Sequence, residues 1–349
     1  MATNVVGIDI GTMSVRAVEV SNPGKSQPTL LRYHEVPLPV GSVTRGEVVD
    51  IQAVAAALRQ LWSAGRFKSR NVVLGMGNQR VLARELSVPK MPLARIRETL
   101  PFEVQDLLPI PVVEAVLDFY PIADVESENG PMVRGLLIAA IKAAVLANIK
   151  TTALAGLTTI DVDLIPFALT RLLLSRPGVE GTVALVDIGG STTSVVIATN
   201  GVPQFVRIIA TGGDDITQAL ERDFELEADQ AAALKRRLGL AVGSVAAADK
   251  VAVEVIYRIA KEQLSSLRNT INYFVNTRPM DAVHLIVLSG GGARLRGLPE
   301  ALAEMTRLSV VVGDPLSTVM LAHELDTKEL LTNVSAYSVA LGLALGRAA

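Results

Sequence analysis

The sequence has no cysteine among its 349 residues. Without thiols the chain cannot form disulfides, thiolate nucleophiles, zinc–thiolate sites or iron–sulfur clusters. Histidine is nearly as scarce. We interpret the three that are present, His34, His284 and His323, as structural or surface residues, because none has the spacing of a metal ligand. Charged residues make up only 19% of the chain and hydrophobic residues 50%, which is typical of a globular protein and not of a disordered one.

Neither an excess of one charge nor a long hydrophobic run is present. The formal net charge of -2 gives no reason to expect a nucleic-acid partner. The most apolar stretches are interrupted by Lys142 or are shorter than the roughly 20 residues that a membrane span needs. The first ten residues, MATNVVGIDI, do not read as a signal peptide. We therefore expect a soluble, cytoplasmic protein that reaches a membrane only through a partner.

Three familiar motifs are absent as well. The chain has no GxxxxGK[ST] loop, no Rossmann GxGxxG fingerprint and no GxSxG nucleophile turn. Strands nevertheless alternate with helices along most of the chain, which predicts an α/β fold with a substantial parallel sheet. Asp50 is a predicted helix N-cap. In a region with several prolines we expect a helix that ends near Pro109 and Pro111, a strand over 112–121 and a polar hairpin loop over 123–131. We expect residues 214–275 to be mostly helical.

One unit occurs twice. The stretch GIDIGTMSVRAVEV contains Asp9, and the stretch VDIGGSTTSVVIA contains Asp187, 178 residues later. In each copy an apolar strand ends on Asp-Ile-Gly, small hydroxyl residues follow, and a second β-rich segment begins. We predict two β-hairpins whose tips contain Gly and Ser or Thr. Each turn alone could be an ordinary strand end, but two at corresponding places favour a shared function.

Such tips suit phosphate. Glycine lets the backbone approach closely, successive N–H groups can surround an anion, and hydroxyls add donors. The two aspartates cannot bind phosphate directly, but they can hold a hydrated Mg²⁺ that bridges phosphate oxygens. We therefore predict Asp9 and Asp187 as metal-binding or water-positioning residues. The candidate nucleotide-binding residues of the hairpins are Gly11, Thr12, Met13, Ser14, Gly189, Gly190, Ser191 and Thr192.

A third Gly-rich stretch, LSGGGARLRGL, lies between a predicted strand and a predicted helix. It would allow flat contact with a nucleoside and bring helix N–H groups near phosphate, although it could also be a packing turn. Two further glycines begin the segment GGDDIT, where a helix start would approach the phosphates or the ribose. From these two stretches we add Gly212, Gly213, Gly290, Gly291, Gly292 and Arg294 to the candidates.

Taken together, DIGT, DIGGSTTS and SGGGARL resemble the two phosphate motifs and the adenosine motif of the actin-like ATPase superfamily, which includes actin, DnaK chaperones, sugar kinases, FtsA and MreB. The finer similarity is to the PilM family of type IV pilus assembly proteins. It covers nearly the whole chain, and its most specific part is LPFEVQDLLPIPVVEAVLDFYPI, which resembles an inserted subdomain shared by PilM and FtsA.

The resemblance implies a fold and a function. It implies two actin-like lobes of mixed sheet and helix, a helical subdomain and an inserted, SHS2-like α/β subdomain. The expected ranges are 1–83 with 164–182 for the first lobe, 84–163 for the insert, 183–211 with 276–349 for the second lobe, and 212–275 for the helical subdomain. The final helix of the second lobe is expected to pack back toward the first lobe. The resemblance also implies ATP or ADP with Mg²⁺ between the lobes. The expected partner is the cytoplasmic tail of a PilN-like inner-membrane protein, held between the first lobe and the insert. Other motor or platform proteins of the pilus, and further copies of this chain in a homo-oligomer, stay open as additional partners.

The sequence departs from its relatives at a few positions. Actin-like hydrolases often carry Glu or Gln on the first connecting helix, whereas this chain has Ile165 before Pro166, so the resemblance implies weak hydrolysis at most. Ser266 and Asn269 replace charged residues near the expected adenine site. Two other functions stay open. One is an FtsA-like division protein, although no basic amphipathic helix follows LGLALG. The other is a sugar-kinase-type phosphotransferase, although no catalytic Asp is evident in the first lobe.

Overall fold

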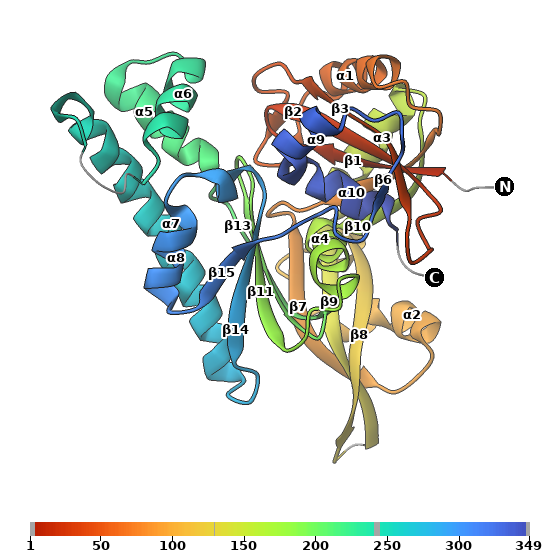
Figure 1. Ribbon diagram of the computed structural model, residues 1–349. Helices are drawn as coiled ribbons and strands as arrows, with labels where there is room; N and C mark the ends of the chain where they lie inside the picture. Colours follow the sequence, from red (N-terminus) through yellow and green to blue (C-terminus); the bar gives the residue numbers. More distant parts are fainter. Residues whose placement is uncertain (1–3, 129, 241–244, 347–349) are drawn as a thin grey trace.

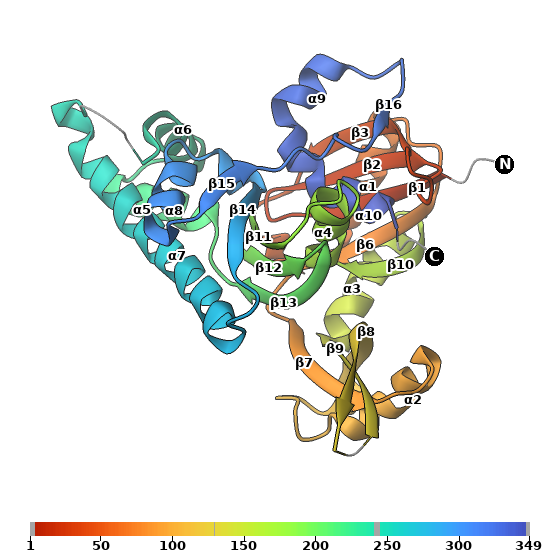
Figure 2. The same ribbon diagram turned by 60° about the horizontal axis from the view of Figure 1, so that its bottom comes forward.

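A computed structural model describes residues 4–128, 130–240 and 245–346 of the chain. In these residues two large sheets lie side by side, with a smaller sheet below them (Figures 1 and 2). None of the helices in the described ranges is both long enough and apolar enough to cross a membrane.

The first large sheet has six strands in the order β10-β6-β1-β2-β3-β16. Both of its faces are buried, as expected for a sheet between helices. Val6 and Ile8 pack with helix α1, and Val5 packs with the C-terminal helix α10 on the opposite face. The bounds are β1 Asn4–Ile10, β2 Ser14–Ser21, β3 Thr29–Pro37, β6 Asn71–Met76, β10 Thr158–Leu164, β16 Met320–Leu321, α1 Ile51–Ala64, α3 Lys142–Leu154 and α10 Ser338–Ala344, with a small hairpin of β4 Val43–Thr44 and β5 Glu47–Val48.

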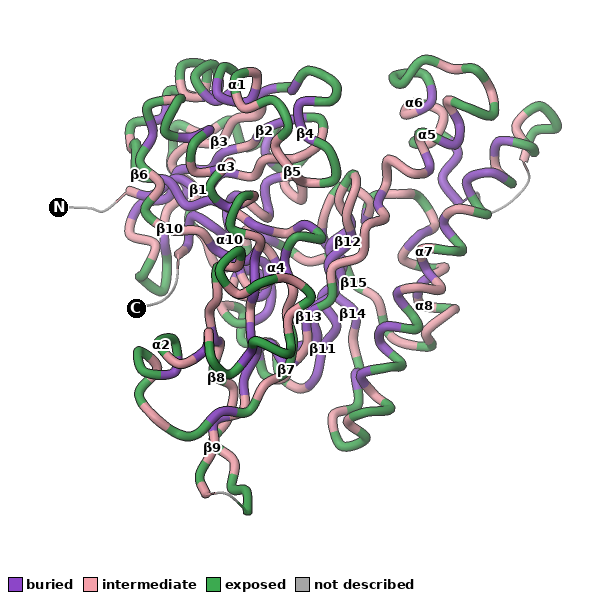
Figure 3. The backbone as a smooth tube through the Cα atoms, turned by 180° about the vertical axis from the view of Figure 1, so that it is seen from behind, coloured by how far each residue is buried: buried purple, intermediate pink, exposed green. Residues whose placement is uncertain are grey.

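The second large sheet has five strands in the order β13-β12-β11-β14-β15. Helices α5, α7 and α8 cover one face, and α4, which continues as the π-helix η2, lies between the two large sheets. Figure 3 shows buried and exposed segments alternating along α7, as its apolar stripe requires. The bounds are β11 Thr182–Ile188, β12 Thr193–Thr199, β13 Val202–Ile209, β14 Val283–Ser289, β15 Ser309–Val312, α4 Ile165–Thr170, η2 Arg171–Ser175, α5 Gly213–Phe224, α6 Ala228–Leu238, η3 Ala247–Asp249, α7 Lys250–Thr277, η4 Gly291–Arg294, α8 Leu298–Thr306, α9 Thr327–Asn333 and η5 Val334–Tyr337.

The duplicated sequence unit folds the same way in both sheets. β1 pairs antiparallel with β2 and parallel with β6, just as β11 pairs antiparallel with β12 and parallel with β14. The turns close identically, because the Gly11 N–H donates to the Ser14 carbonyl at 3.0 Å and the Gly189 N–H donates to the Thr192 carbonyl at 2.9 Å. The predicted pair of hairpins is therefore present, at corresponding edges of the two sheets.

The third sheet, which we call the insert, has the strand order β7-β9-β8 and packs helix α2 on one face. Its elements are β7 Val81–Pro89, α2 Leu93–Glu103, η1 Val112–Glu114, β8 Ala115–Ser127 and β9 Gly130–Ile141. Two expectations were wrong in detail. The helix ends at Glu103, well before the prolines. Most of the expected loop over 123–131 is strand, because β8 stays paired with β9 as far as Ser127.

Strand β10 lies within the range expected for the insert, which reaches residue 163. It pairs in parallel with β6 of the six-stranded sheet. The preceding helix α3 packs against α1 and leads from the insert into that sheet (Figure 2). The chain returns to the same sheet at its C-terminal end, where β16 pairs with β3 and α10 packs on β1.

Candidate functional site

The two hairpin turns meet. The Thr12 and Ser191 hydroxyls, one from each turn, lie 2.9 Å apart and share a hydrogen bond. Of the neighbouring candidates, Ser14 is buried in β2 and Met13 is half exposed at the tip. The predicted phosphate-binding turns are thus brought together from opposite halves of the chain.

The second hairpin is held by the start of α5. The N–H groups of Gly213 and Asp214 donate to the carbonyls of Gly189 and Gly190, at 2.9 and 2.8 Å. A Cβ atom on Gly212 would lie 2.2 Å from the Gly190 carbonyl oxygen, so this close approach requires glycine. Gly212 and Gly213 therefore position the second turn, which is a role that the sequence alone did not indicate.

Asp187, at the end of β11, is a buried carboxylate with an unpartnered oxygen. Among the residues that the structure describes, its Oδ1 and the nearby Ser289 Oγ have no hydrogen-bond partner. Burial raises the pKa of the Asp187 carboxyl to about 6. A buried acceptor without a donor is costly, and a bound cation or its hydration shell would remove that cost.

Asp9, the counterpart of Asp187, has partners. Arg16 on β2 lies 3.6 Å from its carboxylate and forms a 2.8 Å ion pair with Glu35 on β3. Burial nevertheless raises the pKa of Asp9 above its usual value, against the opposing effect of Arg16. Within the described ranges no three carboxylate or imidazole groups gather as a metal site. A cation there would thus depend on few protein ligands, with water and phosphate supplying the rest.

The Gly-rich stretch after β14 divides into packed and open positions. Gly290 has a positive φ of 82°, and its Cβ would lie 2.4 Å from the Ile188 carbonyl oxygen. A Cβ on Gly292 would lie 2.2 Å from Ile188 Cγ2, whereas one on Gly291 would meet nothing within 4 Å. Of the three predicted nucleoside contacts, Gly291 is thus the one with free space beside it.

Arg294 bridges to another part of the chain. Its guanidinium donates to the Asn333 side chain at 3.0 Å and to the Thr332 carbonyl at 2.8 Å. Both acceptors lie at the end of α9, which follows β16. This contact spans the region between the five-stranded and the six-stranded sheet.

Sequence reasoning missed Lys235 on α6 and Gln263 on α7. The Lys235 ammonium donates to the Gly213 carbonyl at 2.9 Å and to Thr217 at 2.7 Å, and burial lowers its pKa. Gln263 Nε2 donates to the Gly212 carbonyl at 2.6 Å. Both brace the start of α5 and therefore the second turn. The sequence placed each of them on an amphipathic helix, but it contained no pattern that indicated a contact with the second turn.

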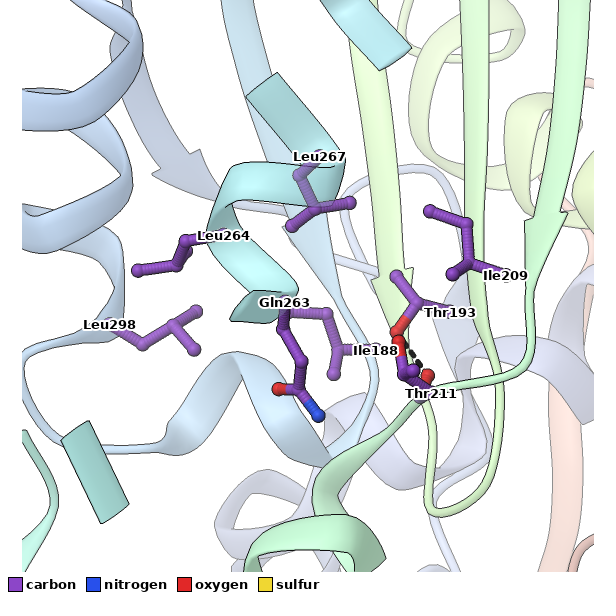
Figure 4. A pocket seen from close by; sticks show the side chains of 8 residues that line it. All are labelled: Ile188, Thr193, Ile209, Thr211, Gln263, Leu264, Leu267 and Leu298. Atoms are coloured by element: carbon purple, nitrogen blue, oxygen red, sulfur yellow. Dashed lines mark hydrogen bonds between the residues drawn. The ribbon is translucent and has the colours of Figure 1, made fainter. Parts of the chain in front are cut away.

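A small pocket lies next to this turn, between α7, the start of α8 and the ends of three strands. Figure 4 shows its side chains, with the Thr193 hydroxyl donating to the Thr211 carbonyl at 2.7 Å. Its lining residues are Ile188, Thr193, Ile209, Thr211, Gln263, Leu264, Leu267 and Leu298. Ser266 and Asn269 face a separate hollow that Arg207 also lines.

Ile165, at the start of α4, fills a space beside Gly75 of β6 and Gly77, which follows that strand. Cβ atoms on Gly75 and Gly77 would lie 2.7 and 2.8 Å from its side chain. The residue is therefore an apolar packing element at the start of the helix that lies between the two large sheets.

Comparisons with known proteins agree with this architecture. The chain is 22% identical to the cell division protein FtsA of Bacillus subtilis, over 89% of this chain and 78% of that protein. It is 26% identical to FtsA of Pseudomonas aeruginosa, over 90% of this chain and 83% of that protein. In fold it is similar to MreB5 of Spiroplasma citri bound to AMPPNP, with a TM-score of 0.53, 11% identity and 97% and 94% of the two chains covered.

A stronger likeness is to the solved PilM–PilN type IV pilus biogenesis complex. The TM-score is 0.85 and the identity 29%, with 99% of this chain and 98% of that chain covered. The sequence profile of the family Type IV pilus assembly protein PilM matches residues 7–348. The actin-like fold expected from the sequence is confirmed, and the chain belongs to the PilM family of type IV pilus assembly proteins.

Proposed function

We propose that this protein is an ATP-binding scaffold of the type IV pilus assembly machinery. The observation that carries the nucleotide part is the meeting of Thr12 and Ser191, from two hairpins of the same design, beside the unpartnered carboxylate of Asp187. The fold neighbour MreB5 is bound to AMPPNP, which supports a nucleotide at the corresponding place. The FtsA relatives are distant, and no separate observation favours a division function.

The residues present fit ATP with Mg²⁺. The two turns, with Thr12 and Ser191 at their tips, would hold the phosphates from opposite sides. Asp187 would hold hydrated Mg²⁺. Asp9 would be the second carboxylate and the weaker ligand, because it is already paired with Arg16. Gly291 would lie against the nucleoside. Bound Mg²⁺ would neutralise phosphate charge, and Arg16 adds a fixed positive charge close to the first turn.

We infer that the nucleotide acts by binding more than by turnover. A general base or water-orienting group must lie within hydrogen-bond reach of the attacking water. Ile165 has no acceptor, and its side chain is engaged with Gly75 and Gly77. Hydrolysis is therefore expected to be slow.

The partner would be the cytoplasmic tail of a PilN-like inner-membrane protein, as in the PilM–PilN complex that this chain resembles. Exposed apolar side chains occur on both sides of the junction between the six-stranded sheet and the insert: Val49 after β5, Leu146 on α3 and Val116 on β8. α3 contacts β5, and Ala115 pairs with Ile141 just before α3 begins, so these elements adjoin. We propose that the tail binds at this junction and holds the protein at the inner face of the cytoplasmic membrane.

Calorimetric titration with ATP–Mg²⁺ and with ADP–Mg²⁺ tests the nucleotide site. Asp187→Ala and Gly190→Glu are expected to weaken ATP binding at least about tenfold, through loss of the metal ligand and through added bulk and charge. Gly291→Ala meets no protein atom, so a loss of affinity there would report direct contact with the ligand. Gly24→Ala, also in open space but in a distant loop, is the matched control. Unchanged affinity in Asp187→Ala and Gly190→Glu would show that the site is misplaced.

A second titration tests the partner. The probe is a synthetic peptide with the N-terminal cytoplasmic sequence of the PilN-like protein. Leu146→Glu is expected to weaken peptide binding, because it places a charge in an apolar junction. Leu331→Glu, at an exposed leucine of α9, is the control. Failure of the unmodified protein to bind the peptide would contradict the pilus role and leave the nucleotide site untouched.

A further inference from the structure

The insert touches the five-stranded sheet as well as the six-stranded one. Strand β7 of the insert lies beside β13, the edge strand of the five-stranded sheet. Both views show the two strands next to each other (Figures 1 and 2). The insert is thus in contact with both halves of the molecule that form the candidate nucleotide site.

A group of four polar side chains joins the two sheets, and we call it the bridging cluster. Glu85 on β7 forms an ion pair with Arg278, which follows α7, and lies 3.8 Å from Arg134 on β9. Gln204 on β13 accepts from both arginines, from Arg134 at 3.4 Å and from Arg278 at 3.3 Å. Two residues of the cluster therefore come from the insert and two from the five-stranded half.

The insert and the five-stranded sheet also share a hydrophobic core. Leu136 and Ala140 of the insert belong to the same buried group as Val196 and Val206 of the five-stranded sheet. Apolar burial holds two surfaces together without specifying an angle, whereas charge-assisted hydrogen bonds do specify one. Arg278 is further fixed by its position over the Phe274 ring, 5.3 Å from the centroid. The bridging cluster is thus the part of the interface that sets the orientation of the insert.

Two continuous connections run from the bridging cluster to the candidate nucleotide site. β13 carries Gln204 near its start and leads directly into Thr211, Gly212 and α5. α7 ends beside Arg278 and, about 22 Å earlier along its axis, places Gln263 against the Gly212 carbonyl. A shift of Gly212 would therefore reach the insert through a strand and through a helix.

The insert also leads to the proposed partner junction. β9, which carries Arg134, continues into α3 at Lys142, and α3 carries Leu146. Resting on the proposed function, we infer that the bridging cluster couples the two ligands. Nucleotide binding at the second turn reorients the insert through Glu85, Arg134, Gln204 and Arg278, and this changes the affinity for the peptide. Thermodynamic linkage then requires the peptide to change ATP affinity by the same factor.

The test measures that factor in both directions. Peptide affinity is determined by fluorescence anisotropy with and without saturating ATP–Mg²⁺, and ATP affinity with and without peptide. In the unmodified protein each ligand is expected to change the affinity of the other by at least about fivefold. In Arg278→Met and in Glu85→Gln the factor is expected to fall to within about twofold of 1, while each ligand alone binds as before.

Lys90→Met is the matched control. It breaks an ion pair with Asp124 that lies wholly within the insert and does not reach β13, so the factor should persist. Thermal melts of every variant identify any loss of folding. If Arg278→Met is unstable, Glu85→Gln gives the same readout from a half-exposed carboxyl.

The outcomes are separable. Variants that keep the full coupling factor would overturn the role of the bridging cluster. Two ligands that bind the unmodified protein without affecting each other would overturn the coupling itself. Failure of either ligand to bind the unmodified protein would overturn the proposed function, and this inference with it.

Discussion

At the scale of single residues, the two repeated aspartates have different surroundings. Asp9 lies beside Arg16, whereas Asp187 is buried with an unpartnered oxygen. Identical motifs in the sequence thus become unequal sites, because the neighbours come from other strands. The pattern DIG predicted both aspartates, but it could not indicate that only the Asp9 carboxylate has an arginine side chain, that of Arg16, beside it.

Asp187 should make the stability of the nucleotide-free protein depend on pH. Its folded-state pKa of about 6 lies above the ordinary 3.8, so the folded state favours the protonated form. Stability is therefore lost as pH rises through about 6, by about 1 kcal/mol between pH 5 and pH 7.5. Asp187→Asn should lack this component. Urea denaturation of both proteins at the two pH values, without Mg²⁺, gives the difference. An identical pH dependence would contradict the prediction.

Gly212 should tolerate no side chain. A methyl group there would collide with the Gly190 backbone, which neighbouring hydrogen bonds to Gly213 and Asp214 hold in place. Gly212→Ala is expected to displace the second turn, lowering the melting temperature and weakening ATP binding at least about tenfold. Gly24→Ala, where a Cβ meets nothing, should change neither. Differential scanning fluorimetry with and without ATP–Mg²⁺ reads both effects.

At the scale of elements, local sequence signals predicted the hairpins and helices. They did not predict which strands pair with each other. The expected N-cap of α1 is confirmed, since Asp50 accepts from the N–H groups of Gln52 and Ala53. The place of β10 beside β6 had no local signal, because it depends on a pairing between residues 87 or 88 positions apart, such as Thr158 with Asn71. Residues 123–127 were expected to form part of a loop, yet cross-strand pairing with β9 keeps them extended.

The N-cap of α1 provides a prediction about stability alone. Asp50→Ala removes two side-chain hydrogen bonds to the first turn, at 3.0 and 2.9 Å, and should cost about 1 kcal/mol of unfolding free energy. Because both lost hydrogen bonds lie within the first turn of α1, ATP affinity should be unchanged. Asp249, at the same position of α7, makes no such capping bond and instead pairs with Arg237, so Asp249→Ala should cost less. Equal losses in the two variants would show that capping is not the cause.

At the scale of the whole molecule, the candidate nucleotide site lies where the two large sheets meet. No local window of sequence contains it, because Thr12 and Ser191 are brought together by α4 and α10 packing between and behind the sheets. The repeat predicted the two hairpins and the residues at their tips. It could not supply the contacts of α5, α6 and α7 that hold the second one, since those depend on the tertiary arrangement of three helices. The assignment of residue ranges to lobes and subdomains stays a prediction.

The absence of cysteine allows a direct test of the facing turns. In the double variant Thr12→Cys with Ser191→Cys the two thiols would be the only ones in the chain, and they would replace hydroxyls that lie 2.9 Å apart. A disulfide is expected to form readily under mild oxidation without nucleotide. Bound ATP–Mg²⁺ should slow its formation, because the phosphates would occupy the space between the tips. The oxidised protein should lose ATP binding and regain it on reduction, whereas each single variant should be insensitive to oxidant. A rate of oxidation that saturating ATP–Mg²⁺ leaves unchanged would place the phosphates elsewhere.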